Sequence, residues 1–201
     1  MGQRLVISVI ENRERLATIY FHWSGYTKSV YDELRTLINM LDDKTIDRTV
    51  LTREGFQKIE SAKVEEEDTL LKLVRMYESV GGGLSDEADE AFEKKYPGVE
   101  YSMDVSRNDG LIDFTEEGMR NADCWAEATA KVDLDFREVS VEPFYYVDPD
   151  DLEPDDVVTE LSEDPFSFIF DEIEDRYNMI CNVDSAYVKY KDDETIYGII
   201  E

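Results

Sequence analysis

The sequence predicts an α+β protein in which antiparallel sheets, built from hairpins, pack against helices. Apolar residues make up 42% of the 201 residues, enough to bury a core although 35% of the residues are charged. Runs in which apolar and polar residues alternate come in pairs, with turn residues between the two runs of a pair. Runs with apolar residues at helical spacing lie in blocks between these pairs. Because strands and helices do not alternate strictly, an α+β organisation is favoured over a doubly wound parallel sheet.

The first half of the chain is expected to open with a hairpin and continue with helices. From about Thr27 the apolar residues recur at helical spacing, with charged residues on the opposite face. Three glycines at 81–83 stop a later helix, and Ser85 is a typical N-cap for the next one. In order, the expected elements are strands 4–10 and 15–22, a helix from about 27 to 41, and helices 53–64, 66–80 and 85–96.

The second half is expected to be rich in strands. Asp109-Gly110 is a hairpin signal, and Asp148 to Pro154 is the best candidate for an exposed loop or linker. We therefore divide the chain into 1–147, an α+β core domain, and 148–201, an acidic loop, helix and closing hairpin packed on the same domain. In order, the expected elements are strands 99–105 and 110–114, helix 115–125, strands 128–136 and 139–147, a helix from Pro165 to 176, and strands 185–190 and 194–200.

Negative charge is the strongest feature of the composition. The chain has 49 acidic and 21 basic residues, a formal net charge of −28. Such a chain repels nucleic acid and anionic membranes, so we expect neither as a direct partner. No apolar run reaches the roughly 18 residues of a membrane span. The N-terminus lacks the pattern of a signal peptide, so we expect a cytoplasmic location.

The acids are unevenly placed along the chain. Residues 138–175 hold 15 acids and neither Lys nor Arg. Solubility and adaptation to salt are competing explanations for the acidity, but a general adaptation would spread the acids more evenly. We therefore predict that this segment binds a basic protein surface. The predicted partner-binding residues are Asp148, Asp150, Asp151, Glu153, Asp155, Asp156, Glu160, Glu163, Asp164, Asp171 and Glu172.

The sequence offers weak candidates for chemistry. His22 is the single histidine and follows a predicted strand, a place where catalytic groups often lie, but no nearby acid would orient it. One histidine with Cys124 and Cys181, expected as buried free thiols, falls short of a zinc site. The acidic loop does not fit the calcium-binding pattern, because Glu153 stands where the turn glycine belongs. We therefore expect no catalytic residue, metal or cofactor.

Two segments resemble known proteins. The first resemblance is to small acidic proteins of phages and prophages of Gram-positive bacteria, which have no assigned activity. It lies in the segments RLVISVIENRERLATIYFHWSGYTKSVYDEL and SRNDGLIDFTEEGM. The HWSGYT and NDGLI segments carry this likeness, which covers roughly residues 2–147. Residues 107–118 also resemble N-terminal-nucleophile hydrolases, which stack sheets between helices and need a terminal Cys, Ser or Thr. Removal of Met1 would expose Gly2, so this likeness implies a layered fold without its nucleophile.

Charge and resemblance together predict a phage-type acidic inhibitor of a host defence protein, of the anti-CRISPR or anti-restriction type. In nucleic-acid mimicry, carboxylates take the place of phosphates and meet the same Lys and Arg side chains. The expected partner is a basic host nuclease or effector that binds nucleic acid. Two alternatives stay open: an acidic binding or regulatory module without mimicry, and a hydrolase that uses His22.

Overall fold

The computed structural model describes residues 4–25, 27–42, 47–52, 55–60, 68–79, 81–101, 109–142, 158–161, 166–182, 187–190 and 197–199. The helices are α1 (Thr27–Leu41), α2 (Thr69–Ser79), α3 (Asp86–Lys95), α4 (Glu116–Trp125) and α5 (Ile173–Asn182), with a 3-10 turn at Phe170–Glu172. The strands are β1 (Leu5–Glu11), β2 (Glu14–Phe21), β3 (Asp47–Thr52), β4 (Gly55–Glu60), β5 (Gly83–Leu84), β6 (Asp109–Asp113), β7 (Ala128–Asp133), β8 (Glu138–Glu142), β9 (Val158–Leu161), β10 (Ser167–Ile169), β11 (Tyr187–Tyr190) and β12 (Tyr197–Ile199).

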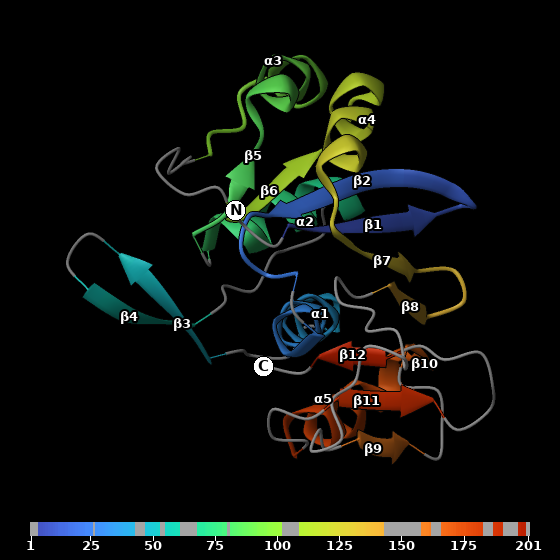
Figure 1. Cartoon of the computed structure of the whole chain (residues 1–201). Coiled ribbons are helices and arrows are strands. Elements are labelled where there is room, and N and C mark those ends of the chain that lie inside the picture. Colours follow the sequence, from blue (N-terminus) through green and yellow to red (C-terminus); the bar gives the residue numbers. More distant parts are fainter. Residues whose placement is uncertain are drawn as a thin grey trace.

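Seven of these strands form one open sheet in the order β10-β8-β7-β1-β2-β6-β5 (Figure 1). The β1–β7 and β5–β6 pairings are parallel, and the others are antiparallel. A three-stranded sheet, β12-β11-β9, and the β3–β4 hairpin are separate from it. The predicted α+β class is confirmed, and the sheet adds two parallel pairings to the predicted hairpins.

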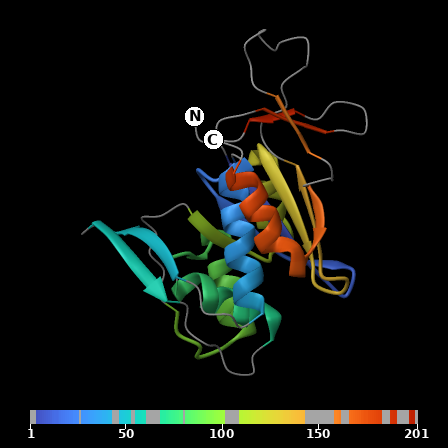
Figure 2. The ribbon, with the colours of Figure 1, turned by 90° about the horizontal axis from the view of Figure 1, so that it is seen from below.

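The two faces of the seven-stranded sheet have different coverings. The inner face packs against α1, α2 and α5, and Figure 2 shows α1 and α5 side by side along it. Figure 1 shows α3 and α4 on the opposite side, over the outer face. The main described layers are therefore helix, sheet and helix. Strand residues buried on the inner face include Val9, Ala17, Ile112, Val132, Val139 and Phe168.

The predicted N-terminal hairpin is confirmed, and its turn shows why the two strands pair in this register. Asn12 and Arg13 both have positive φ, 55° and 64°. Two such residues give a tight turn whose twist matches that of paired strands. The backbone N–H of Arg13 donates to the Asp135 carboxylate at 2.9 Å, a contact across the end of the sheet. This bond supports a conformation that arginine adopts at a cost.

Two elements beyond 147, β10 and α5, complete the same core. Phe168 of β10 stacks on Tyr31 of α1 with ring centroids 5.8 Å apart. The Arg35 guanidinium of α1 donates to the Glu174 carboxylate of α5 at 2.9 Å. This hydrogen bond raises the pKa of Arg35, although burial opposes the shift. A domain boundary at 147 would thus separate β10 and α5 from the sheet and helix that they pack against.

The predicted helix at 53–64 is wrong, because β4 occupies residues 55–60 and pairs with β3. The spacing of Phe56 and Ile59 fits a helix, but the preceding strand is rich in the β-branched residues that favour pairing. The hairpin predicted between 99–105 and 110–114 is not seen in the residues that the structure describes, which leave out 102–108. Residues 99–101 are not in a strand, and β6 pairs with β2 and β5 instead.

The helix predicted to open at Pro165 is wrong over its first residues. Phe166, Phe168 and Phe170 are buried while Ser167 and Ile169 are exposed, which is the two-residue period of a strand. The phenylalanines belong to β10 and its flanks, and α5 begins only at Ile173. The other helices and hairpins are confirmed within a few residues where the structure describes them. The predicted loop at 148–154 lies outside the described residues.

Asp68 starts α2 and ties it to the segment that follows α3. Its carboxylate accepts from the backbone N–H of Leu71 at 2.9 Å and from the Tyr96 hydroxyl at 2.6 and 2.8 Å. Burial would raise the pKa of Asp68, but the hydrogen bonds from Tyr96 and Leu71 outweigh it and lower this pKa below its ordinary value. Asp68 is therefore a helix cap whose hydrogen bonds favour its charged form.

We expect the Asp68→Asn variant to be less sensitive to acid than the wild type. A carboxyl group whose pKa is lowered in the folded state stabilises the fold at pH values above the ordinary carboxyl pKa. This stabilisation is lost as the pH falls through the folded-state pKa. Asparagine caps as well as aspartate but does not titrate. Urea unfolding at about pH 7 and pH 3 should show a smaller loss in the variant. Asp32→Asn, at an exposed position in α1, is the control, and equal losses in wild type and Asp68→Asn would refute the role.

Candidate functional site

The outer face of the sheet carries a pocket of about 410 Å³ beneath α3 and α4, which we call the aromatic pocket. β2 and the residue after it contribute Tyr20 and His22, and α4 contributes Trp125. β6 contributes Leu111 and Asp113. Ser85 and Glu87 line it from the start of α3, and Arg4, Thr18, Gly118 and two further α4 residues complete it.

Strand alternation explains how these residues reach the pocket. In β2, Ala17, Ile19 and Phe21 point into the core, so Thr18 and Tyr20 face outward. The register pairs Thr18 with Asp113 and Tyr20 with Leu111, which places all four on the outer face. Thr18 and Asp113 are nevertheless buried, because the helices cover this half of the sheet.

Asp113 holds the starts of α3 and α4 together. Its Oδ1 accepts from the backbone N–H of Thr115 at 2.7 Å and from the Thr115 hydroxyl at 2.8 Å. Its Oδ2 accepts a short hydrogen bond from the Ser85 hydroxyl. Ser85 and Thr115 are the N-caps of the two helices. Gly118 lies so close that a Cβ there would overlap the Asp113 carboxylate. This buried carboxylate therefore fixes one wall of the pocket.

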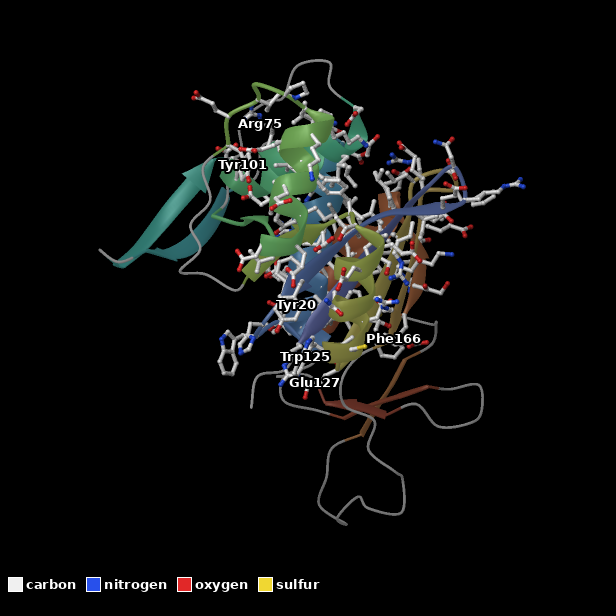
Figure 3. All side chains as sticks on the ribbon, turned by 90° about the horizontal axis from the view of Figure 1, so that it is seen from above. Tyr20, Arg75, Tyr101, Trp125, Glu127 and Phe166 are labelled. Carbon is white, nitrogen blue, oxygen red and sulfur yellow. The ribbon has the colours of Figure 1, made fainter. Side chains whose placement is uncertain are left out.

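The open side of the pocket is aromatic. The Tyr20 hydroxyl and His22 Nδ1 share a hydrogen bond of 2.9 Å, and the His22 ring packs edge-on against Trp23 with centroids 4.7 Å apart. Trp23 is 57% exposed and Trp125 is 58% exposed. Figure 3 shows Tyr20, Trp125 and Glu127 grouped at one end of the outer face. Two tryptophans thus meet solvent at or beside one pocket.

Arg4 occupies part of this aromatic surface. Its guanidinium carbon lies 5.1 Å from the centre of the Trp125 ring, a cation–π contact. Its backbone N–H donates to the Glu127 carboxylate at 2.9 Å. The Trp125 ring therefore already binds one guanidinium, which belongs to the protein itself.

The pocket brings His22, Ser85 and Asp113 together, but their hydrogen bonds do not form a catalytic triad. In a triad the histidine lies between the nucleophile and the acid. Here the Ser85 hydroxyl donates directly to Asp113, and His22 Nδ1 pairs with Tyr20. Among the described side chains, no cluster of three His, Cys, Asp or Glu residues could hold a metal ion. The geometry is better suited to binding than to nucleophilic attack.

A second hollow, of about 700 Å³, lies over β1, β7, β8 and β10 on the same outer face. Its outward residues are mostly polar, as expected for the less covered half of a sheet. They include Ser8, Thr129, Lys131, Ser140, Glu142 and Ser167. Unlike the aromatic pocket, this hollow carries no tryptophan or tyrosine in its lining.

The predicted acidic contact residues are only partly visible. Glu160 lies on β9, where the backbone alone is described. Asp171 lies 3.4 Å from Arg137, and Glu172 lies 3.2 Å from Arg176, so both described side chains pair with a base of this chain. The predicted residues outside the described part are Asp148, Asp150, Asp151, Glu153, Asp155, Asp156, Glu163 and Asp164.

Sequence reasoning did not find the aromatic pocket. One available signal was the outward register of Thr18 and Tyr20 in a strand that was correctly predicted.

The prediction that Cys124 is buried is wrong, because this cysteine is exposed on the outer side of α4. The spacing of α4 residues alone does not show which helix face meets the sheet.

Comparison of the chain with models of protein families, with curated proteins and with solved structures finds no match. None of the described helices combines the length and apolarity needed to cross a bilayer.

Proposed function

We propose that this chain is a phage-type acidic inhibitor that binds a basic, nucleic-acid-binding defence protein of the host. The observation that supports it best is how the described bases are used. Seven of them pair with carboxylates of the same chain, so the excess acids determine the sign of the surface. The bases that form such ion pairs are Arg15, Arg35, Arg75, Lys94, Lys131, Arg137 and Arg176.

Exposed aromatic residues give such a surface an anchor. Acidic side chains mainly steer a basic partner and speed association, whereas buried aromatic contacts supply most of the binding energy. Trp23 and Trp125 are more than half exposed, which is unusual for residues of this size. Tryptophan, tyrosine and arginine are the residue types enriched at binding hot spots, and all three occur at the aromatic pocket.

The pocket also favours the second candidate function, an acidic regulatory module without mimicry. A mimic of nucleic acid needs carboxylates in a spacing like that of phosphates. A pocket with aromatic walls instead selects one side chain of a partner. The two functions differ in whether nucleic acid competes for the same partner surface.

The test is elution of partners from the immobilised chain. A Gram-positive bacterial lysate is applied, and bound proteins are eluted with duplex DNA or with rising NaCl. Under mimicry, DNA should release nucleic-acid-binding proteins, and affinity should fall steeply between about 50 and 500 mM NaCl, because exposed charges are screened within about 10 Å at 0.1 M salt. Release by salt but not by DNA would support the regulatory module instead. Binding that is insensitive to both would refute electrostatic recognition.

A further inference from the structure

We infer that the aromatic pocket receives the side chain of an arginine from the basic partner. The inference rests on the proposed function and adds to it the chemical group that is recognised. An arginine side chain has an apolar stem and a planar cationic head with five N–H donors. The site must therefore offer apolar surface, an aromatic ring and carboxylates within one hollow.

The size and apolar part of the pocket fit this ligand. A volume of about 410 Å³ lies within the range of about 300–1,000 Å³ that small-ligand pockets occupy. Leu111, Gly118 and Ala122 give it an apolar lining without long side chains that would fill it. The stem of an arginine can pack there while its head reaches polar groups, as amphipathic side chains commonly do.

The aromatic part suits a guanidinium in particular. Planar guanidinium groups stack on rings more readily than ammonium groups do. Arg4 already makes this contact with Trp125 at 5.1 Å, so the ring environment is compatible with the cation. Tyr20 and His22 add two further rings to the same lining. A second guanidinium can approach these rings or replace Arg4.

The acidic part selects a cation over an anion. Asp113 has three hydrogen bonds in the structure, two at Oδ1 and one at Oδ2. A carboxylate has about four acceptor positions, so these three bonds do not use all of them at a residue that lines the pocket. Glu87 adds an exposed carboxylate in the first turn of α3. Two carboxylates in the lining, in a chain of net charge −28, oppose any anionic ligand.

The test uses three short peptides, Ac-Gly-Arg-Gly-NH₂ and its lysine and citrulline counterparts. Binding is followed by calorimetry and by the two indole N–H signals in proton NMR, because the chain has only Trp23 and Trp125. We expect the arginine peptide to bind saturably and to shift both signals. The citrulline peptide, which lacks the charge, should bind at least about tenfold more weakly, with the lysine peptide between them.

Variants locate the contact. Trp125→Leu is expected to weaken the arginine peptide about three- to thirtyfold, the usual range of a cation–π contact. Glu87→Gln should also weaken it. Phe136→Leu, at a 61% exposed aromatic residue in the β7–β8 turn, is the matched control and should change nothing. Melting curves confirm that each variant is folded.

The outcomes separate this inference from the proposed function. No saturable shift with the arginine peptide, or equal binding of the citrulline peptide, overturns the arginine pocket. If the Trp125→Leu chain then still captures a partner that DNA releases, the proposed function stands without the pocket. If the arginine peptide binds as expected but the lysate yields no salt-sensitive partner, the pocket stands and the proposed function fails.

Discussion

Gly118→Ala is expected to lower the free energy of unfolding by about 2–3 kcal/mol, the upper part of the range for overpacking a buried site. In an exposed helix the same exchange would stabilise the protein by about 1 kcal/mol. Here the new methyl group would overlap the Asp113 carboxylate. That carboxylate cannot move aside without losing its hydrogen bonds to Ser85 and Thr115. Urea unfolding monitored by circular dichroism measures the change.

A double variant tests the cause of this loss. Asp113→Ala alone should destabilise the protein, because Ser85 and Thr115 lose their acceptor. Combined with Gly118→Ala, it also removes the overlap, so the double variant should lose at least about 1 kcal/mol less than the sum of the single losses. Arg120→Ala, exposed on the same helix, should lie within about 0.5 kcal/mol of the wild type. Additive single losses would show that the overlap is not the cause.

Replacing Asp150, Asp151, Asp155 and Asp156 together with lysine is expected to weaken binding of the DNA-released partner at least tenfold. Each exchange removes a negative charge and adds a positive one in a segment that has no Lys or Arg. Steering charges act mainly on the association rate, so the rate of association should fall more than the rate of dissociation changes. Surface plasmon resonance at low salt separates the two rates.

The control for this variant must change the same charge elsewhere without weakening a helix. Reversal of Asp86, Glu87 and Asp89 would be unsuitable, since these acids lie in the first turn of α3, where they stabilise the helix dipole. Glu14, Asp32, Glu93 and Glu100 are exposed and lie on separate segments. If their reversal weakens binding as much as reversal of the acidic segment, net charge alone determines affinity and the segment is not the contact.

Local signals predicted most of the elements that were found. Ser85 and Thr27 stand at or next to the observed helix starts, and Gly81, with φ of 86°, follows the end of α2. These features were predictable because a cap, a glycine stop or a two-residue turn depends on neighbouring residues. The errors at 55–60 and 166–169 share one cause: aromatic and aliphatic residues at mixed spacing fit either a helix or a strand.

The candidate site depends on pairings between distant segments. Tyr20 faces Leu111 because β2 pairs with β6, and the sequence pattern instead suggested that 110–114 would pair with 99–105. Asp113 accepts a hydrogen bond from Ser85, 28 residues earlier in the chain. No local pattern encodes these contacts, since each depends on which strand becomes the neighbour of which.

The sequence by itself determined the charge of this protein, its α+β class and most of its helices and hairpins. These follow from composition and from periodicity over short stretches, where local preferences and burial agree. Only the tertiary structure decided that Tyr20, His22, Glu87, Asp113 and Trp125 line one pocket. The physical reason is that burial fixes the inner face of each strand, while the position of the outward side chains is left to sheet order and to the helices that cover them.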